Sequence, residues 1–332
     1  MKRYILPLAL ALALLLPSLL FSLREREPVE TEPAAQTEEQ VRPTVSNTVN
    51  QMIRVKEQDT VVEMELDSYV LGVVLGEMPA DFELEALKAQ AVATRTYTLR
   101  KVLKQSKHSD AHVCTDASCC QAFIREDDYL QSKGDAEDLE KVRRAVTETT
   151  GQVLTYQGEL IEATYFSSSG GKTEDAVAVW GTSVPYLQSV SSPGEEPKNG
   201  EKQFQYSKQE FRAKLGLPES AVLTDDSMEM TYTEGGGVEQ MTIGNQSFSG
   251  TELRTLLGLP STVFSVSFEK DDILITTKGN GHRVGMSQYG AEAMAVAGSQ
   301  YDEILYHYYS GTKLETLTDV QMQAIFDKAG NL

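Results

Sequence analysis

The pattern of apolar and polar residues divides the chain into helices and strands. Apolar residues alternate with glutamates over residues 61–66, which predicts a half-buried strand. Apolar and small residues recur near one face of residues 84–103, which predicts the longest helix. Further helices are predicted over 69–77, 138–149, 251–257, 291–297 and 301–308, and strands over 52–55, 152–156, 161–166 and within 204–216 and 228–274. This mixture predicts an α+β fold with helices inserted among antiparallel strands.

The first fifty residues differ from the rest. Residues 5–23 carry no charge and follow Lys2 and Arg3. As a helix they would span roughly 30 Å, enough for a bilayer core. The alternative is a cleaved signal peptide, but no A-x-A spacing precedes Arg24, so we predict an uncleaved transmembrane anchor. Residues 24–50 lack aromatics and are rich in Glu, Pro, Thr and Gln, which predicts a disordered tether.

These boundaries predict four parts. They are a cytoplasmic start and anchor over 1–23, the tether over 24–50, one folded domain over 51–320 and a tail over 321–332. The basic start predicts a single-pass protein of the cell membrane whose folded domain lies outside the cytoplasm. The formal charge is −19, from 49 acidic and 30 basic side chains, and such a chain repels a polyanion. We therefore exclude nucleic acid as a partner.

Glu77 is the candidate acid. It lies among apolar residues at the end of a predicted helix, before Pro79, and Gly76 beside it leaves room for a ligand. Burial would disfavour its charged form and suit it to donate a proton. The alternative is a solvent-facing or capping glutamate. Arg95, within the long helix, either points outward or pairs with Glu77 or a substrate carboxylate.

The segment 108–120 holds all three cysteines. His108, Cys114, Cys119 and Cys120 offer four ligands of the kind that zinc prefers, with His112 as a fifth. A disulfide is the usual alternative in an exported protein, but three cysteines leave one unpaired. We favour one structural zinc with no open position for catalysis.

Two glycine-bearing loops carry neutral polar side chains. Residues 279–291 hold four glycines with His282 and Gln288, and such donors and acceptors suit a sugar. Tyr165, Ser167 and Ser169 precede a second loop, which we interpret as the lining of a cleft because no Gly-x-Ser-x-Gly motif is present. Trp180, the only tryptophan, either lies in the core or stacks on a sugar ring.

Four of these motifs resemble the stage II sporulation protein D family of Gram-positive, spore-forming bacteria. The motifs are LGVVLGEMP at 71–79, LKAQAVATRTY at 87–97, SSSGGKT at 167–173 and GHRVGMSQYGA at 281–291. The resemblance runs in order from about residue 52 to 314, and the predicted anchor fits it. Arg283 stands where the family usually has glycine.

The resemblance implies a lytic transglycosylase that cleaves peptide-free peptidoglycan glycan strands to 1,6-anhydro-muramyl products during spore engulfment. It implies that residues 51–320 form the catalytic domain and that Glu77 is catalytic. Both glycine-bearing loops would line a glycan-binding groove. We predict Tyr165, Ser167, Ser169, His282 and Gln288 from these loops, together with Arg95 from the long helix, as the substrate-binding residues. The resemblance also implies a histidine–cysteine metal loop after the long helix, and two partners: a cell-wall amidase and a multi-pass membrane protein of the engulfment machinery.

Two alternatives remain open. One is a non-catalytic glycan-binding activator of a cell-wall amidase, which would not need a special environment for Glu77. The other is a glycan hydrolase, which would need a second carboxylate near Glu77. Asp81 and Glu83 are the nearest candidates in the sequence.

Overall fold

A computed structural model describes the chain except for residues 1–50, 105–106, 134, 196–200 and 331–332. The predicted anchor and tether lie outside the described residues. Within the described part, none of the helices is both long and apolar enough to span a bilayer.

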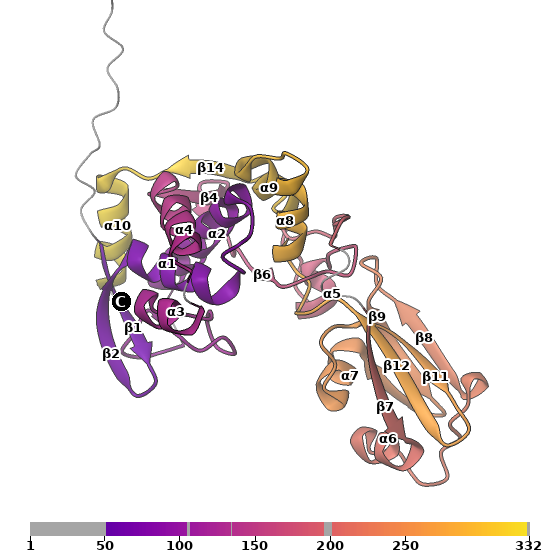
Figure 1. Ribbon diagram of the computed structural model, residues 1–332. Coiled ribbons are helices and arrows are strands. Elements are labelled where there is room, and N and C mark those ends of the chain that lie inside the picture. The colour runs from indigo at the N-terminus through magenta and orange to yellow at the C-terminus, as the bar shows by residue number, and fades with distance from the viewer. Residues whose placement is uncertain (1–50, 105–106, 134, 196–200, 331–332) are drawn as a thin grey trace, which may run out of the picture. The chain divides into compact units, whose positions relative to one another are not determined.

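The first hydrophobic core surrounds helix α2 (Leu84–Leu103), and other helices lie around it (Figure 1). Helix α2 is buried along most of its length. Its alanines at 86, 89, 91 and 93 are fully buried, and these small side chains let neighbouring helices approach closely. The helices in contact with α2 are α1 (Leu66–Glu77), α4 (Ala136–Glu148), α8 (Gln288–Val296), α9 (Tyr301–Tyr308) and α10 (Asp319–Gly330). Two shorter helices are α3 (Glu126–Lys133) and α5 (Ala176–Trp180).

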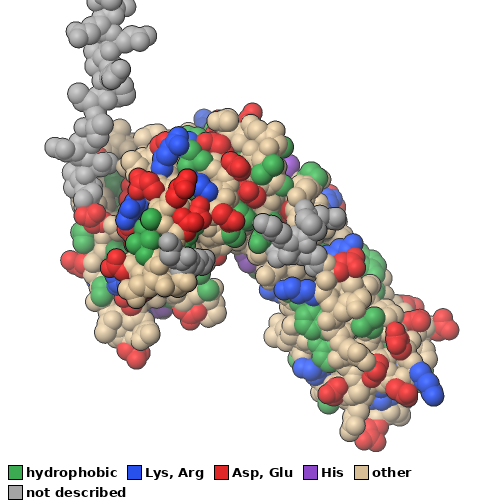
Figure 2. Space-filling model, viewed as in Figure 1, with side chains coloured by type: hydrophobic (Ala, Val, Ile, Leu, Met, Phe, Trp, Pro, Cys, Tyr) green, Lys and Arg blue, Asp and Glu red, His purple; other side chains and the backbone are tan. Residues whose placement is uncertain are grey.

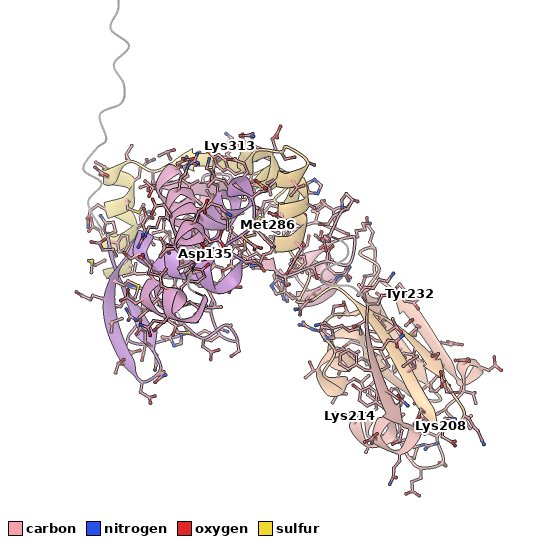
Figure 3. All side chains as sticks on the ribbon, viewed as in Figure 1. Asp135, Lys208, Lys214, Tyr232, Met286 and Lys313 are labelled. Carbon is pink, nitrogen blue, oxygen red and sulfur yellow. The ribbon has the colours of Figure 1, made fainter. Side chains whose placement is uncertain are left out.

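Short strands border this core. The hairpin of β1 (Met52–Glu57) and β2 (Thr60–Glu65) also pairs through β1 with β3 (Val113–Cys114). Strand β4 (Gln152–Tyr156) lies between β5 (Glu159–Leu160) and β14 (Lys313–Thr316). Strand β6 (Tyr165–Phe166) pairs in parallel with β13 (Met286–Ser287), whose Met286 is labelled in Figure 3. This last pairing joins the two glycine-bearing loops.

A second hydrophobic core lies within residues 202–278. One sheet has the order β11 (Val263–Phe268), β12 (Asp272–Lys278), β7 (Lys202–Ser207), and the other has the order β10 (Gln246–Ser249), β9 (Val238–Ile243), β8 (Met228–Tyr232). Helices α6 (Lys208–Leu215) and α7 (Gly250–Leu257) bury Phe211 and Leu253 against Met241, Ile273 and Ile275. A short 3₁₀ helix, Asp225–Ser227, completes this part. One predicted domain therefore contains two cores.

Most predicted elements are confirmed, and two predictions need correction. Residues 161–166 are not one strand, because only Tyr165–Phe166 pairs. The predicted tail forms α10 instead, whose Met322 and Ile325 are buried in the first core. Helix α3 was not predicted, because it is short and mostly polar.

Candidate active site

Two glycines of α1 bring a distant segment against the end of that helix, where Glu77 lies. A Cβ at Gly72 would lie 2.2 Å from the ring of Phe123, and one at Gly76 would lie 2.8 Å from the carbonyl carbon of Ala122. The glycines thus make room for residues 122–124. The N–H of Ile124 donates to the carbonyl of Gly72 at 2.9 Å. The N–H of Ala122 donates to Oε1 of Glu77 at 2.7 Å.

The surroundings of Glu77 favour its protonated form. Burial raises the pKa of Glu77 above its usual value, and the hydrogen bond from Ala122 and the side chain of Gln288 oppose that rise. No carboxylate of the described residues contributes to this shift. Asp81 and Glu83 instead act on the pKa of Glu292, which accepts from the N–H of Glu83 at 2.7 Å. Glu77 is therefore suited to donate a proton without a neighbouring carboxylate.

Tyr165 and Gln288 border Glu77 because β6 and β13 pair just before α8 begins. The hydroxyl of Tyr165 is buried, and the charge of Glu77 helps to raise the pKa of Tyr165. The Gln288 side chain is near enough to lower the pKa of Glu77, although its Nε2 makes no hydrogen bond of normal geometry within the described residues. The hydroxyl of Tyr165 and Nε2 of Gln288 are both buried, so they form part of the wall beside the acid.

His282 is an uncharged hydrogen-bonding group at neutral pH. Its Nδ1 accepts from the N–H of Val284 at 3.1 Å, and the ring also hydrogen-bonds to the backbone of Tyr165. Burial, and next the charge of Arg254, lower the pKa of His282 to about 4. Its role is therefore to hold the loop and its neighbours in place and not to exchange protons.

A buried ion pair fixes both glycine-bearing loops. Nη1 of Arg283 lies 2.8 Å from Oε1 of Glu174, and both side chains are almost completely buried. Arg283 also donates to the carbonyls of Ser169, Lys172 and Gly235 at 2.8, 2.6 and 2.6 Å. Its φ of 68° is a conformation that glycine adopts most readily.

The predicted binding serines hold the loop. The hydroxyl of Ser169 donates to Glu195 at 2.7 Å, and its side chain is fully buried, so the structure contradicts a binding role for that hydroxyl. The carbonyl of Ser167 accepts from the N–H of Tyr289 at 3.0 Å. Glu174 and Glu195 were missed in the sequence, because nothing in their local pattern distinguishes them from surface glutamates.

The structure also contradicts the prediction that Arg95 binds substrate or pairs with Glu77. Its side chain is fully buried, and Nη2 lies 2.9 Å from Oδ1 of Asp67 in the first turn of α1. Nη1 donates to the carbonyl of Thr149 at 2.8 Å, just after α4. A guanidinium at a helix C-terminus satisfies carbonyls that lack helical partners. Arg95 therefore joins α1, α2 and α4.

The predicted metal ligands are close together. The ligand atoms of His108, Cys114, Cys119 and Cys120 all lie within 4.8 Å of one another, and the three cysteines are free thiols. Nε2 of His108 lies 3.6 Å from Sγ of Cys119 and 3.7 Å from Sγ of Cys120. Nδ1 of His112 accepts instead from the N–H of Arg54 at 3.0 Å. His112 thus anchors β1.

Comparisons with known proteins identify the family of this chain. Residues 54–156 match the family model described as "SpoIID: Stage II sporulation protein". The chain is 36% identical to stage II sporulation protein D of Bacillus subtilis, over 87% of this chain and 85% of that protein. It is 35% identical to stage II sporulation protein D of Bacillus amyloliquefaciens, over 91% and 92%. The amidase enhancer of Bacillus subtilis is 33% identical, over 73% of this chain and 40% of that protein.

The chain therefore belongs to the stage II sporulation protein D family.

Replacement of Arg95 by Met tests its structural role. We expect the free energy of unfolding to fall by about 1–3 kcal/mol, because buried carbonyls lose a charged donor. The pKa of Glu77 should not change. Arg144→Met is the matched control, since this arginine is 62% exposed in an i,i+4 pair, and should cost less than about 0.5 kcal/mol. Denaturant unfolding measures both, and equal losses would contradict the assignment.

Replacement of Gln288 by Leu tests the electrostatics of Glu77. Gln288 stabilises the carboxylate, so its loss should move the pKa of Glu77 further above the usual value. The carboxyl group would then stay protonated to higher pH. An NMR titration of ¹³C-labelled glutamate carboxyls measures the shift, with the exposed Gln131→Leu as control. A lower pKa in Gln288→Leu would refute this account of the site.

Proposed function

We propose that the protein is a lytic transglycosylase that cleaves peptide-free glycan strands of peptidoglycan at the bond between N-acetylmuramic acid and N-acetylglucosamine. One observation carries the proposal. Glu77 is a half-buried carboxylic acid with a raised pKa, and no second carboxylate of the described residues affects it. Glycoside hydrolases generally need two carboxylates. One is enough when the attacking group is a hydroxyl of the substrate itself.

In this mechanism Glu77 acts twice. Protonated Glu77 gives its proton to the glycosidic oxygen as the bond from that oxygen to C1 of the muramyl residue breaks. The C6 hydroxyl oxygen of the same residue then bonds to C1, and its proton passes to the carboxylate of Glu77. The products are a 1,6-anhydro-muramyl end and a free hydroxyl on the departing sugar, and no water is consumed. Glu77 ends protonated, ready for the next strand.

The surrounding groups have supporting roles in this proposal. The N–H of Ala122 holds Oε1 of Glu77, and so orients the carboxyl group. The buried Tyr165 hydroxyl and Gln288 amide would form the wall of the site beside the carboxyl group. Neutral His282 holds the loop beside them. The side chains of Tyr165, Gln288 and His282 do not transfer a proton in this mechanism.

The cellular role follows from the relatives. Two of them are named for stage II of sporulation, which supports a role in the cell wall during spore engulfment. The name of the amidase enhancer supports a link to a cell-wall amidase, which would supply peptide-free strands. We include the predicted membrane anchor, an extracytoplasmic site and a multi-pass membrane partner in this proposal.

A non-catalytic activator of an amidase is the second candidate. The relative named an amidase enhancer favours it. Such a protein would bind glycan, but it would have no use for an acid whose pKa is raised by burial. Loss of cleavage with retained binding after replacement of Glu77 separates the two candidates.

Replacement of Glu77 by Gln should therefore slow glycan cleavage by about 10²–10⁴-fold, the range for a lost acid–base group. The shape is nearly unchanged, so folding and glycan binding should persist. The exposed Glu83→Gln is the control, and it also tests the hydrolase alternative. Turnover of peptide-free strands measures both variants. Wild-type turnover in Glu77→Gln would eliminate the assignment, and loss in Glu83→Gln would favour a hydrolase.

We further propose that His108, Cys114, Cys119 and Cys120 hold one structural zinc. Bonds of about 2.0–2.3 Å in a tetrahedron set the ligand atoms about 3.5–3.8 Å apart. The two measured N–S separations, 3.6 and 3.7 Å, fit this geometry. Four protein ligands fill a tetrahedral ion, so zinc would supply order to the loop and take no part in the reaction.

Replacement of Cys120 by Ser should lower the zinc content and the melting temperature, because metal binding contributes to folding. Glycan cleavage should fall with the folded fraction. The control variant Ala117→Ser, at an exposed position of the same loop, should bind one full equivalent of zinc. Elemental analysis and thermal unfolding check this. A wild-type protein purified without metal, and containing a disulfide by mass spectrometry, would contradict the zinc proposal.

A further inference from the structure

Trp180 presents an exposed aromatic face outside the contacts of Glu77. It ends α5, it is 44% exposed, and it is the only tryptophan of the chain. Its ring lies 5.6 Å from the ring of His282, and the ring of Phe166 also lies 5.6 Å from that of His282. An exposed indole supported by further rings is suited to stack on the apolar face of a sugar.

This aromatic group is connected to the acid through β6. Tyr165 lies beside Glu77, and the next residue, Phe166, packs against His282. His282 in turn hydrogen-bonds to the backbone of Tyr165. A glycan strand held at Glu77 would therefore need only a few further sugars to reach Trp180.

Arg254 on α7 has no acidic partner among the described residues. Burial alone lowers its pKa, and it makes no side-chain hydrogen bond or ion pair with any described residue. The fully buried Arg95 and Arg283 each contact a carboxylate. A guanidinium held partly away from water without a counter-charge is costly, so a ligand with an anionic group would gain from binding it.

The backbone brings Arg254 to the aromatic group. The N–H of Leu259 donates to the carbonyl of Arg254 at 2.8 Å, and the N–H of Gly281 donates to the carbonyl of Pro260 at 3.0 Å. The end of α7 is thereby held to the residue before His282. The charge of Arg254 is near enough to lower the pKa of His282.

The strongly negative net charge of the protein makes an arginine without a counter-charge a notable site for an anionic ligand. The net charge is −19, and Figure 2 shows acidic side chains spread over the visible face. Each muramic acid residue of a peptide-free strand carries a lactyl carboxylate, which such a surface repels. A strand that still bears peptides has an amide in place of that carboxylate. An arginine beside a sugar-stacking ring, without an acidic partner among the described residues, would favour the peptide-free strand over the strand that bears peptides.

We propose that Trp180 and Arg254 form a subsite for one N-acetylmuramic acid residue with a free lactyl group. The indole stacks on the pyranose ring, the guanidinium binds the carboxylate through two N–H groups, and His282 holds the indole in place. The proposal rests on the glycan substrate of the proposed function. It adds the residue that would select for strands from which the peptides have been removed.

The test measures binding and needs no catalysis. The fluorescence of Trp180 reports directly on this subsite, because the chain has no other tryptophan. Glu77→Gln protein is titrated with peptide-free muramyl oligosaccharides and with chitin oligosaccharides of equal length, which lack the lactyl group. We expect both ligands to change the emission. Adding Arg254→Gln should weaken muramyl binding by about 10-fold or more and chitin binding by less than about 2-fold.

Two further variants complete the experiment. Arg254→Lys keeps the charge but not the two-pronged geometry, so its muramyl affinity should lie between those of wild type and Arg254→Gln. Tyr232→Ala, at an exposed aromatic of β8 labelled in Figure 3, should bind both ligands as before. Circular dichroism establishes whether each variant is folded. If Arg254→Gln does not fold, the comparison of the two ligands is made with Arg254→Lys alone.

The proposal is overturned if Trp180 does not respond to muramyl ligand, or if the arginine variants weaken both ligands equally or neither. These outcomes are separate from the proposed activity. If the wild-type enzyme releases anhydro ends but the titration shows no selective binding, only the subsite proposal is contradicted. If the titration is selective but the wild-type protein is inactive or hydrolytic, the subsite proposal stands and the transglycosylase proposal is contradicted.

Discussion

The contact between helix α1 and residues 122–124 is the constraint on which the candidate site depends. Gly72 and Gly76 lack the Cβ atoms that would collide with Phe123 and Ala122, so the segment lies directly on the helix. This closeness lets the N–H of Ala122 reach Glu77 and helps to bury its carboxyl group. Only Gln121 separates this segment from Cys120, so the order of the cysteine cluster and the position of the acid are coupled through a short stretch of backbone.

Buried charges hold the parts of the first core and its loops together. Arg95 joins three helices through Asp67 and the carbonyls at the end of α4. Arg283 and Glu174 join the two glycine-bearing loops to the turn at Gly235. Each of these guanidinium groups is fully paired, which offsets the cost of removing it from water. Arg254 does not follow this rule, and that difference makes it a candidate for ligand binding and not for structure.

The sequence predicted what local patterns encode. The spacing of apolar residues predicted both ends of α2 correctly. The concentration of histidine and cysteine in one segment predicted the cysteine cluster. Long-range partners were not predictable: the pairing of Arg95 with Asp67, and of Arg283 with Glu174, needs the tertiary structure. The small-residue loop has the composition of a binding surface, but the hydroxyl of Ser169 donates to Glu195, which is 26 residues away in the sequence. Helix α10 was not predicted, although it has 12 residues, as many as α1, and its buried Met322 and Ile325 stand three residues apart, as on one helix face.

Product analysis in isotopically labelled water tests the central claim, that one carboxylic acid suffices at this site. The wild-type protein is incubated with peptide-free glycan strands in H₂¹⁸O, and the products are examined by mass spectrometry. Attack by the substrate's own C6 hydroxyl predicts 1,6-anhydro-muramyl ends that contain no ¹⁸O. Reducing ends that carry ¹⁸O would show that water is the attacking group, and would contradict the account of Glu77 given above.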